Sequence, residues 1–127
     1  VFQRMTSEGA NKSTPTAPDV EWFIQCLNVT TVNDPPLTEE QGVSLKGFLY
    51  ATVDVVLKGA SSCTLRPWFW NEALDNWVSG TSEVIQTATR LKTQVDGTNS
   101  FYVEIVDIET TTPSLVVISI AIAGSAN

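Results

Sequence analysis

The chain has 127 residues, a formal net charge of −7 and a hydrophobic content of 43%, which fits one domain with an independent core. It contains no histidine, so catalysis by Ser/His/Asp or Cys/His groups is excluded and the commonest metal ligand is missing. The seven basic residues are scattered along the sequence, which argues against a nucleic-acid partner because no basic stripe exists.

Residues 1–19 are predicted to form an extended N-terminal arm, and residues 20–127 a single domain. Ser, Thr, Asn, Gly and Pro dominate residues 6–18, and no apolar periodicity is present there. Val1 and Phe2 are apolar, so this end has the composition to anchor on a neighbouring subunit. The alternative is a frayed terminus.

Two strand regions are predicted in the first half of the domain. Residues 20–31 are apolar on both faces and end at a Pro-Pro breaker. Residues 37–42 are expected to form one helical turn or a polar loop. The second strand region covers residues 43–58, and alternate positions there are purely apolar and face the core, namely Leu49, Ala51, Val53, Val55 and Leu57.

Residues 64–78 are the most distinctive stretch, because three of the four tryptophans lie in it. Residues 63–70 and 76–86 are predicted to form a hairpin around a polar turn, and its second arm is interrupted at Ser79-Gly80-Thr81. Alternation places Leu65, Pro67 and Phe69 on the opposite face of the strand from Arg66, Trp68 and Trp70.

The hairpin supplies the candidate binding residues Arg66, Trp68, Trp70 and Trp77. Trp68 and Trp70 are expected to lie about 7 Å apart on one face of a strand. That spacing suits stacking against sugar rings and also burial against another protein. The alternative is that the rings form the core of a second sheet, since tryptophan is highly buried on average. The pattern leaves this choice open.

Three further strands are expected. Residues 89–95 alternate like a half-exposed strand, and Asp96-Gly97 is typical of a hairpin turn. Residues 101–109 place Phe101, Val103 and Ile105 on one face. Residues 115–123 form the last strand, and this apolar run is about half the length of a membrane-spanning helix, so we expect no membrane association.

The last strand is apolar on both faces apart from Ser119. A strand buried on both sides has this composition, whereas a half-exposed strand alternates. One interpretation is an oligomer interface that includes Val116, Ile118, Ile120 and Ile122. The other is a central strand whose outer face lies under a loop or the N-terminal arm. Periodicity does not separate the two.

Cys26 and Cys63 are the only thiols. Strand alternation directs both toward the core, so we expect two buried free thiols. A disulfide is the less favoured alternative, because two cysteines in a chain of this length do not make a disulfide scaffold.

No catalytic or metal-binding pattern is evident. The carboxylate pairs Glu72/Asp75 and Glu39/Glu40 lie in predicted loops and are more simply solvated turn residues. Asp75-Asn76 and Asn33-Asp34 are weak candidates for contact with calcium. Phosphate-binding and dinucleotide-binding loops are missing. We therefore expect no enzyme activity, no cofactor and no metal.

The expected fold is all-β, a single antiparallel β-sandwich of the jelly-roll type with an extended N-terminal arm. Seven or eight strands at regular spacing favour it. An immunoglobulin domain fits less well, because no tryptophan lies between the two cysteines.

Three features resemble small β-sandwich proteins attached to the virions of tailed bacteriophages. They are the arm ending at Thr16-Ala-Pro-Asp19, the unit Leu65-Arg-Pro-Trp-Phe-Trp-Asn-Glu-Ala-Leu-Asp-Asn-Trp77, and the apolar last strand ending at Gly124. The resemblance implies a capsid decoration (cement) or head-tail accessory protein of the virion, which is assembled in the host cytoplasm. It implies a homo-oligomer, with a trimer favoured, and the major capsid protein or other virion subunits as partners.

Two other functions are weighed against this one. The first is a carbohydrate-binding module or receptor-binding tip that uses Trp68, Trp70 and Trp77. The second is a secreted adhesion or pilus-like domain, in which a Cys26–Cys63 bridge is expected.

Overall fold

The computed structural model describes residues 21–126, so the predicted arm lies outside the described residues. The described chain contains two short 3-10 turns, η1 (Glu39–Gln41) and η2 (Pro113–Leu115). Its strands are β1 (Glu21–Val29), β2 (Tyr50–Lys58), β3 (Ala60–Asn71), β4 (Asn76–Ser79), β5 (Glu83–Ile85), β6 (Thr89–Gln94), β7 (Phe101–Thr110) and β8 (Val117–Ser125).

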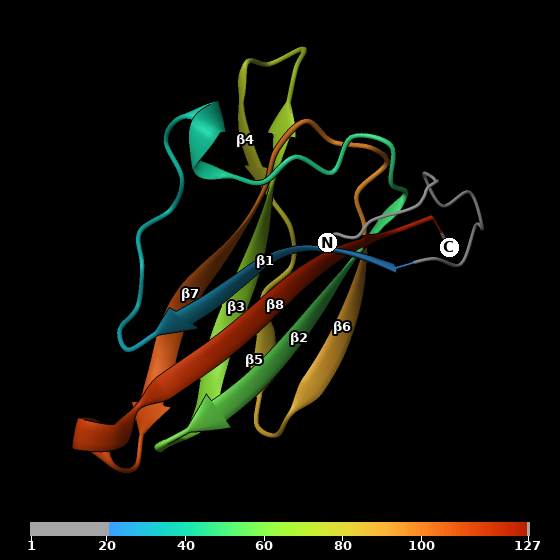
Figure 1. Cartoon of the computed structure of the whole chain (residues 1–127). Coiled ribbons are helices and arrows are strands. Elements are labelled where there is room, and N and C mark those ends of the chain that lie inside the picture. The colour runs from blue at the N-terminus through green and yellow to red at the C-terminus, as the bar shows by residue number, and fades with distance from the viewer. Residues whose placement is uncertain (1–20, 127) are drawn as a thin grey trace.

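The strands form two antiparallel sheets that pack face to face (Figure 1). Sheet A has the order β1-β8-β2-β6. In sheet B, β3 pairs with β7 along one side, and with β4 and β5 at different ends of its other side. The predicted all-β sandwich is confirmed.

We interpret the strand order as a jelly roll in which a loop replaces one strand. Residues 30–49 connect β1 to β2 and run beside β7, where Val43 forms an isolated bridge with Phe101. If this segment is counted as a strand, the connections cross between the sheets as they do in a jelly roll. The sandwich is the observation, and the jelly-roll type stays an interpretation.

The core lies between the sheets and is formed by the residues of each strand whose side chains point toward the opposite sheet. It includes Ala51, Val53, Val55, Leu65, Phe101, Val103, Ile105, Ile118, Ile120 and Ile122. The predicted inward set is confirmed at Ala51, Val53 and Val55. Leu49 was expected in the same set but is 52% exposed, because β2 begins only at Tyr50.

The predicted strand over residues 43–58 is therefore too long at its beginning. Residues 44–49 form a loop, in which Gly47 has a φ of 95° that an L-residue rarely adopts. Leu45 is fully buried at this end of the sandwich. The loop thus contributes the Leu45 side chain to the core, although its residues belong to no strand.

The predicted interruption of the second hairpin arm is confirmed between β4 and β5. Pro67 of β3 lies opposite this gap and has no N–H to offer a neighbouring strand. Its carbonyl still accepts a hydrogen bond from the Gly80 N–H at 2.8 Å. The edge strand therefore leaves the ladder beside the proline and rejoins it at Glu83.

The turn at Asp96-Gly97 forms as expected but does not make a hairpin. Both residues have positive φ, at 50° and 69°, which Asp and Gly adopt most readily. The strands on either side belong to different sheets, because β6 pairs with β2 and β7 pairs with β3. The local sequence determines the dihedral angles of this turn, but the strands that pair on either side of it are determined by residues far away in the sequence.

Candidate binding surface

The outer face of sheet B carries the predicted binding residues. Arg66, Trp68 and Trp70 alternate along β3 with residues that point inward. Register places Arg66 opposite Glu104, Trp68 opposite Tyr102, and Trp70 opposite Trp77. We call this group of six residues the aromatic face: Arg66, Trp68, Trp70, Trp77, Tyr102 and Glu104.

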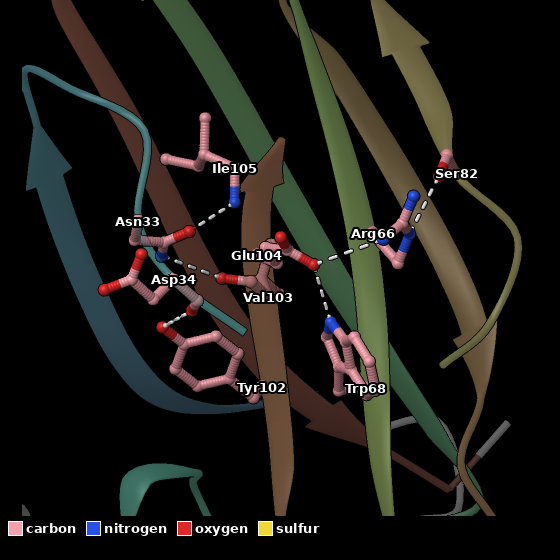
Figure 2. A network of polar contacts seen from close by, with 9 residues as sticks. All are labelled: Asn33, Asp34, Arg66, Trp68, Ser82, Tyr102, Val103, Glu104 and Ile105. Carbon is pink, nitrogen blue, oxygen red and sulfur yellow. Dashed lines mark hydrogen bonds and ion pairs between the residues drawn. The ribbon is translucent and has the colours of Figure 1, made fainter. Parts of the chain in front are cut away.

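A buried carboxylate organises one end of the aromatic face (Figure 2). Glu104 is 6% exposed, and its Oε1 accepts a hydrogen bond from Trp68 Nε1 at 2.8 Å. Arg66 Nη1 lies 3.6 Å from the same oxygen, and Arg66 Nε donates to Ser82 Oγ at 3.2 Å. These contacts give one oxygen of the buried carboxylate its partners, place a positive charge beside it and fix the plane of the Trp68 ring.

Glu104 Oε2 has no hydrogen-bond partner among the described residues. A buried acceptor without a partner costs free energy. A ligand or partner group with an N–H or O–H placed beside Trp68 would satisfy it. The arrangement therefore places a half-buried indole ring, a partly exposed guanidinium and a largely buried carboxylate within one small area.

An aromatic cluster forms the other end of the face. The Trp70 and Trp77 rings meet edge to face, with centroids 5.5 Å apart and an interplanar angle of 80°. The Trp77 and Tyr102 ring centroids are 6.3 Å apart. Such tilted contacts are the favoured geometry for aromatic pairs, and they hold the Trp70 ring against its cross-strand neighbour Trp77.

Trp77 is covered by the loop that precedes β2. It is 6% exposed, and its Nε1 donates to the carbonyl oxygen of Thr38 at 3.1 Å. A Cβ at Gly42 would lie 2.7 Å from the Trp77 ring, so glycine permits this close approach. Trp77 therefore belongs to the interior, whereas Trp68 and Trp70 are half-buried and keep accessible surface.

The same loop covers the outer edge of β7 (Figure 2). Asn33 Nδ2 donates to the Val103 carbonyl at 3.3 Å, and Asn33 Oδ1 accepts from the Ile105 N–H at 2.6 Å. The Tyr102 hydroxyl donates to the Asp34 carbonyl at 2.9 Å. One amide side chain thus takes the place of a paired strand and protects the edge. Asn33, a weak calcium candidate in the sequence, is used here instead.

Burial raises the pKa of Tyr102 above its usual range, and the negative charges of Glu104 and Asp34 raise it further. All three causes disfavour the phenolate. The hydroxyl is therefore kept protonated, as its donation to the Asp34 carbonyl requires.

The four residues proposed for an oligomer interface lie in the interior. Val116, Ile118, Ile120 and Ile122 are 7%, 0%, 1% and 1% exposed. Ile118, Ile120 and Ile122 belong to β8, which is central in sheet A between β1 and β2, and they face sheet B. Val116 lies just before this strand. The structure thus favours the central-strand alternative, and these residues offer no surface to another subunit.

The two cysteines differ from each other. Cys63 is buried as expected, and burial raises the pKa of its thiol. Cys26 was expected to face the core but is exposed. A bulge between Phe23 and Gln25 shifts the alternation of β1, so Leu27 packs inward and Cys26 faces outward. Both thiols are free.

The carboxylates weighed as catalytic pairs remain at the surface. Glu40, Glu72 and Asp75 are exposed, and Glu39 is half-buried. Within residues 21–126, no group of three or more His, Cys, Asp or Glu side chains is placed to hold a metal ion. Within the same residues, no helix is long and apolar enough to cross a membrane.

Sequence reasoning missed Tyr102 and Glu104 as parts of this surface. Alternation along residues 101–109 already separates them from the core residues Phe101, Val103 and Ile105. Their place beside Trp68 depends on the register between β3 and β7, which joins residues far apart in the sequence and has no local signal.

The fold is shared with a protein of phage origin. The crystal structure of the SPBc2 prophage-derived protein YomS is similar to this chain, with a TM-score of 0.54 and 13% sequence identity. The match covers 89% of this chain and 100% of that chain. No protein-family model and no curated protein sequence matches the chain. At this identity, the likeness shows a common fold.

Proposed function

We propose that this chain is a non-enzymatic structural protein of a phage virion, and that it is a capsid decoration (cement) protein. The observation that carries the proposal is the likeness in fold to a prophage-derived protein over that protein's full length. The resemblance of the arm, the tryptophan hairpin and the last strand to virion-attached β-sandwich proteins supports the same conclusion.

In this proposal the aromatic face contacts the major capsid protein or another virion subunit. Trp68 and Trp70 are half-buried, and Arg66 lies beside them, with its side chain 35% exposed. Tryptophan and arginine are enriched among the residues that dominate binding energy at protein interfaces. The unpartnered Glu104 oxygen would accept a hydrogen bond from the partner.

On a repeated capsid surface, a modest affinity at each contact is sufficient for stable attachment. Copies linked as a homo-oligomer, for which we favour a trimer, bind a repeated surface with an avidity that exceeds the affinity of one contact. The interior position of the β8 isoleucines leaves oligomer contacts to other parts of the chain.

Cosedimentation tests this proposal. Purified chain is mixed with particles of the encoding phage from which the protein has been removed, and light scattering gives its oligomeric mass. We expect saturable cosedimentation and a homo-oligomer. Trp70→Ala should weaken binding at least about tenfold. Val56→Ala should leave binding unchanged, because Val56 is 44% exposed on the outer face of the other sheet. A monomer that stays in the supernatant contradicts the proposal.

A second candidate function is carbohydrate or receptor binding, which the geometry around Trp68 specifically favours. Sites for small polar ligands combine apolar or aromatic surface with a few placed polar groups. The Trp68 ring is held by Glu104 at 2.8 Å, and a guanidinium and a free carboxylate oxygen lie next to it. Trp77 is excluded from this site by its burial.

A glycan array, followed by tryptophan fluorescence titration of any positive sugar, separates the two functions. A carbohydrate-binding protein would give saturable quenching that is lost in Trp68→Ala. A decoration protein would give no glycan signal and would still sediment with particles.

A further inference from the structure

The outer edge of β6 is open. β6 (Thr89–Gln94) is the last strand on one side of sheet A, and no described strand pairs with its outer edge. Beside it in sheet B, the edge is formed by the short strands β4 and β5 and the gap between them. The opposite edge of sheet B is covered, because Asn33 and Val43 bond to β7. An open edge is a template for pairing with another strand.

The register shows which backbone groups of β6 face outward. Val95 donates its N–H to the Leu49 carbonyl at 2.8 Å, one step before the first residue pair of the β2–β6 ladder. In an antiparallel pair, the backbone groups of successive residues point alternately toward and away from the neighbouring strand. The N–H and C=O groups of Lys92 and Gln94 therefore point away from β2, and an added strand would bond to them.

A cavity of about 350 Å³ lies behind this edge, between the two sheets. Its apolar lining includes Val53, Leu65, Phe69, Leu91, Phe101 and Val103. The cavity opens to solvent beside β6, because Thr81, Glu83 and Lys92 in its lining are exposed. Interiors are close-packed, with few voids larger than a water molecule, and an apolar cavity of roughly 150 Å³ already accommodates benzene. A large apolar side chain therefore fits here.

The charge on β6 favours an acidic partner. Lys92 Nζ lies 4.8 Å from the centroid of the Tyr50 ring, and no carboxylate of the described residues pairs with it. Arg90, on the same outer face, donates from Nε and Nη2 to the two carboxylate oxygens of Asp54 at 2.6 and 2.8 Å. Opposite charges across a strand pair stabilise it, and like charges directly opposite destabilise it. A strand beside β6 should therefore place a carboxylate opposite Lys92.

The same charges argue against a second copy of this chain as the occupant. The β6 strands of two copies would pair antiparallel about a twofold axis. An axis at Leu91 places Lys92 opposite Arg90 of the second copy, and an axis at Lys92 places the two lysines opposite each other. Both arrangements bring like charges together, so a different chain is favoured.

We propose that an extended acidic segment of another protein adds to the outer edge of β6 as a further strand of sheet A. Side chains of the segment alternate between the two faces of the sheet. On the outer face an acidic residue lies opposite Lys92, and on the inner face a large apolar residue fills the cavity beside Leu91. Backbone hydrogen bonds to an open edge supply affinity, and a pocket for one side chain supplies specificity.

This site is separate from the particle binding proposed above. Its edge and cavity share no residue with the aromatic face. The experiment below uses a peptide and no particles, so the failure of one proposal leaves the other standing.

The probe is the fluorescein-labelled peptide Thr-Glu-Phe-Glu-Val-Glu-Thr, and its binding to the full-length chain is measured by fluorescence anisotropy. We expect saturable binding. In the paired geometry the N–H groups of the three glutamates face β6, and those of Phe and Val face away. N-methylation of the three glutamates should therefore abolish binding. N-methylation of Phe and Val, the matched control, should leave it intact.

Variants of β6 test the same contact from the other side. Gln94→Pro removes an outward N–H, and an edge strand tolerates proline where its N–H side faces solvent. We expect binding to weaken at least about fivefold, whereas Gln94→Ala, which keeps the N–H, should bind like the unchanged chain. Circular dichroism checks that each variant is folded. If Gln94→Pro does not fold, the two N-methylated peptides still decide the matter.

A charge exchange tests the acidic character of the partner. Lys92→Glu should weaken binding by about fivefold, because an attraction becomes a repulsion. A peptide with lysine in place of each glutamate should bind Lys92→Glu more tightly than it binds the unchanged chain.

Three results overturn the proposal. The first is a probe peptide that gives no saturable binding. The second is equal binding of the peptide that is N-methylated at its glutamates, which means that the cavity takes an apolar group without strand pairing. The third is a dimer of the free chain that dissociates on Gln94→Pro, which means that the occupant is a second copy.

Discussion

The strands β8 and β3 are the two candidate contact strands of the sequence, and the structure treats them differently. Each is central in its sheet. The β8 isoleucines point inward and are at most 1% exposed, whereas the outward tryptophans of β3 remain half-buried. Apolar residues between the sheets are hidden automatically, but those on an outer face are hidden only where another segment covers them.

The loop that covers the outer face of sheet B stops short of two rings. It lies over Trp77, through the hydrogen bond to Thr38, and leaves Trp68 and Trp70 accessible. The comparison therefore assigns β8 to stability, and it leaves accessible the β3 rings for which we propose a binding role. The following changes test that assignment, from the largest expected effect to the smallest.

The largest effect is expected from Ile120→Ala. Ile120 is 1% exposed in the centre of the core, so its truncation removes buried area and leaves a cavity. We expect a loss of about 3 kcal/mol in the free energy of unfolding, measured by urea denaturation. A loss below about 1 kcal/mol would mean that β8 is not part of the core.

A smaller effect is expected from Trp68→Phe. The change keeps an aromatic ring but removes the N–H that donates to buried Glu104. Hydrogen bonds to charged groups contribute about 1.5–3 kcal/mol, and Arg66 still neutralises the carboxylate, so we expect a loss of about 1 kcal/mol. The fold should be retained, as judged by circular dichroism. Unchanged stability would show that this hydrogen bond does not organise the face.

Alkaline titration probes Tyr102, which belongs to the aromatic cluster at one end of the aromatic face. Because its pKa is raised, Tyr102 stabilises the fold below the ordinary phenol value of 10.0, and this stability is lost as the pH rises through the folded pKa. Phenolate absorbance should show one late-titrating tyrosine, and Tyr102→Phe should remove that phase. A late phase that persists in Tyr102→Phe would contradict the burial of this hydroxyl.

The smallest effect is expected from Asp54→Asn on the outer face of sheet A. The hydrogen bond from Arg90 lowers the pKa of Asp54, and the Arg90 charge adds to this against a desolvation cost. The side chains are 42% and 60% exposed, so the pair contributes below about 0.5 kcal/mol.

The sign of this contribution follows from the lowered pKa. The stability is present above the ordinary Asp value of 3.8 and is lost as the pH falls through the lower folded value. Urea midpoints of the unchanged chain and Asp54→Asn should therefore converge on acidification. A gap that widens would contradict the pairing.

Much of this fold was predictable from local patterns. Alternation located β6 and β7 to within a residue, and Pro67 with Ser79-Gly80-Thr81 marked the break between β4 and β5. The bulge that turns Cys26 outward had no comparable signal, because alternation assumes an unbroken ladder.

Long-range pairing was not predictable. Asp96-Gly97 gave a correct turn between strands of different sheets, and Glu104 reached Trp68 only through the β3–β7 register. The choice between an interior and an exterior position for the isoleucines of β8 likewise depended on its two neighbours, β1 and β2.

The most direct test of a binding role for β3 is hydroxyl-radical footprinting read by mass spectrometry. Free chain and particle-bound chain are oxidised in parallel, and modification is measured at each tryptophan of the hairpin. We predict that Trp68 and Trp70 are oxidised in the free chain and protected on the particle, while Trp77 is protected in both. Equal oxidation of Trp68 and Trp70 in the two states would contradict a contact through the outer face of sheet B.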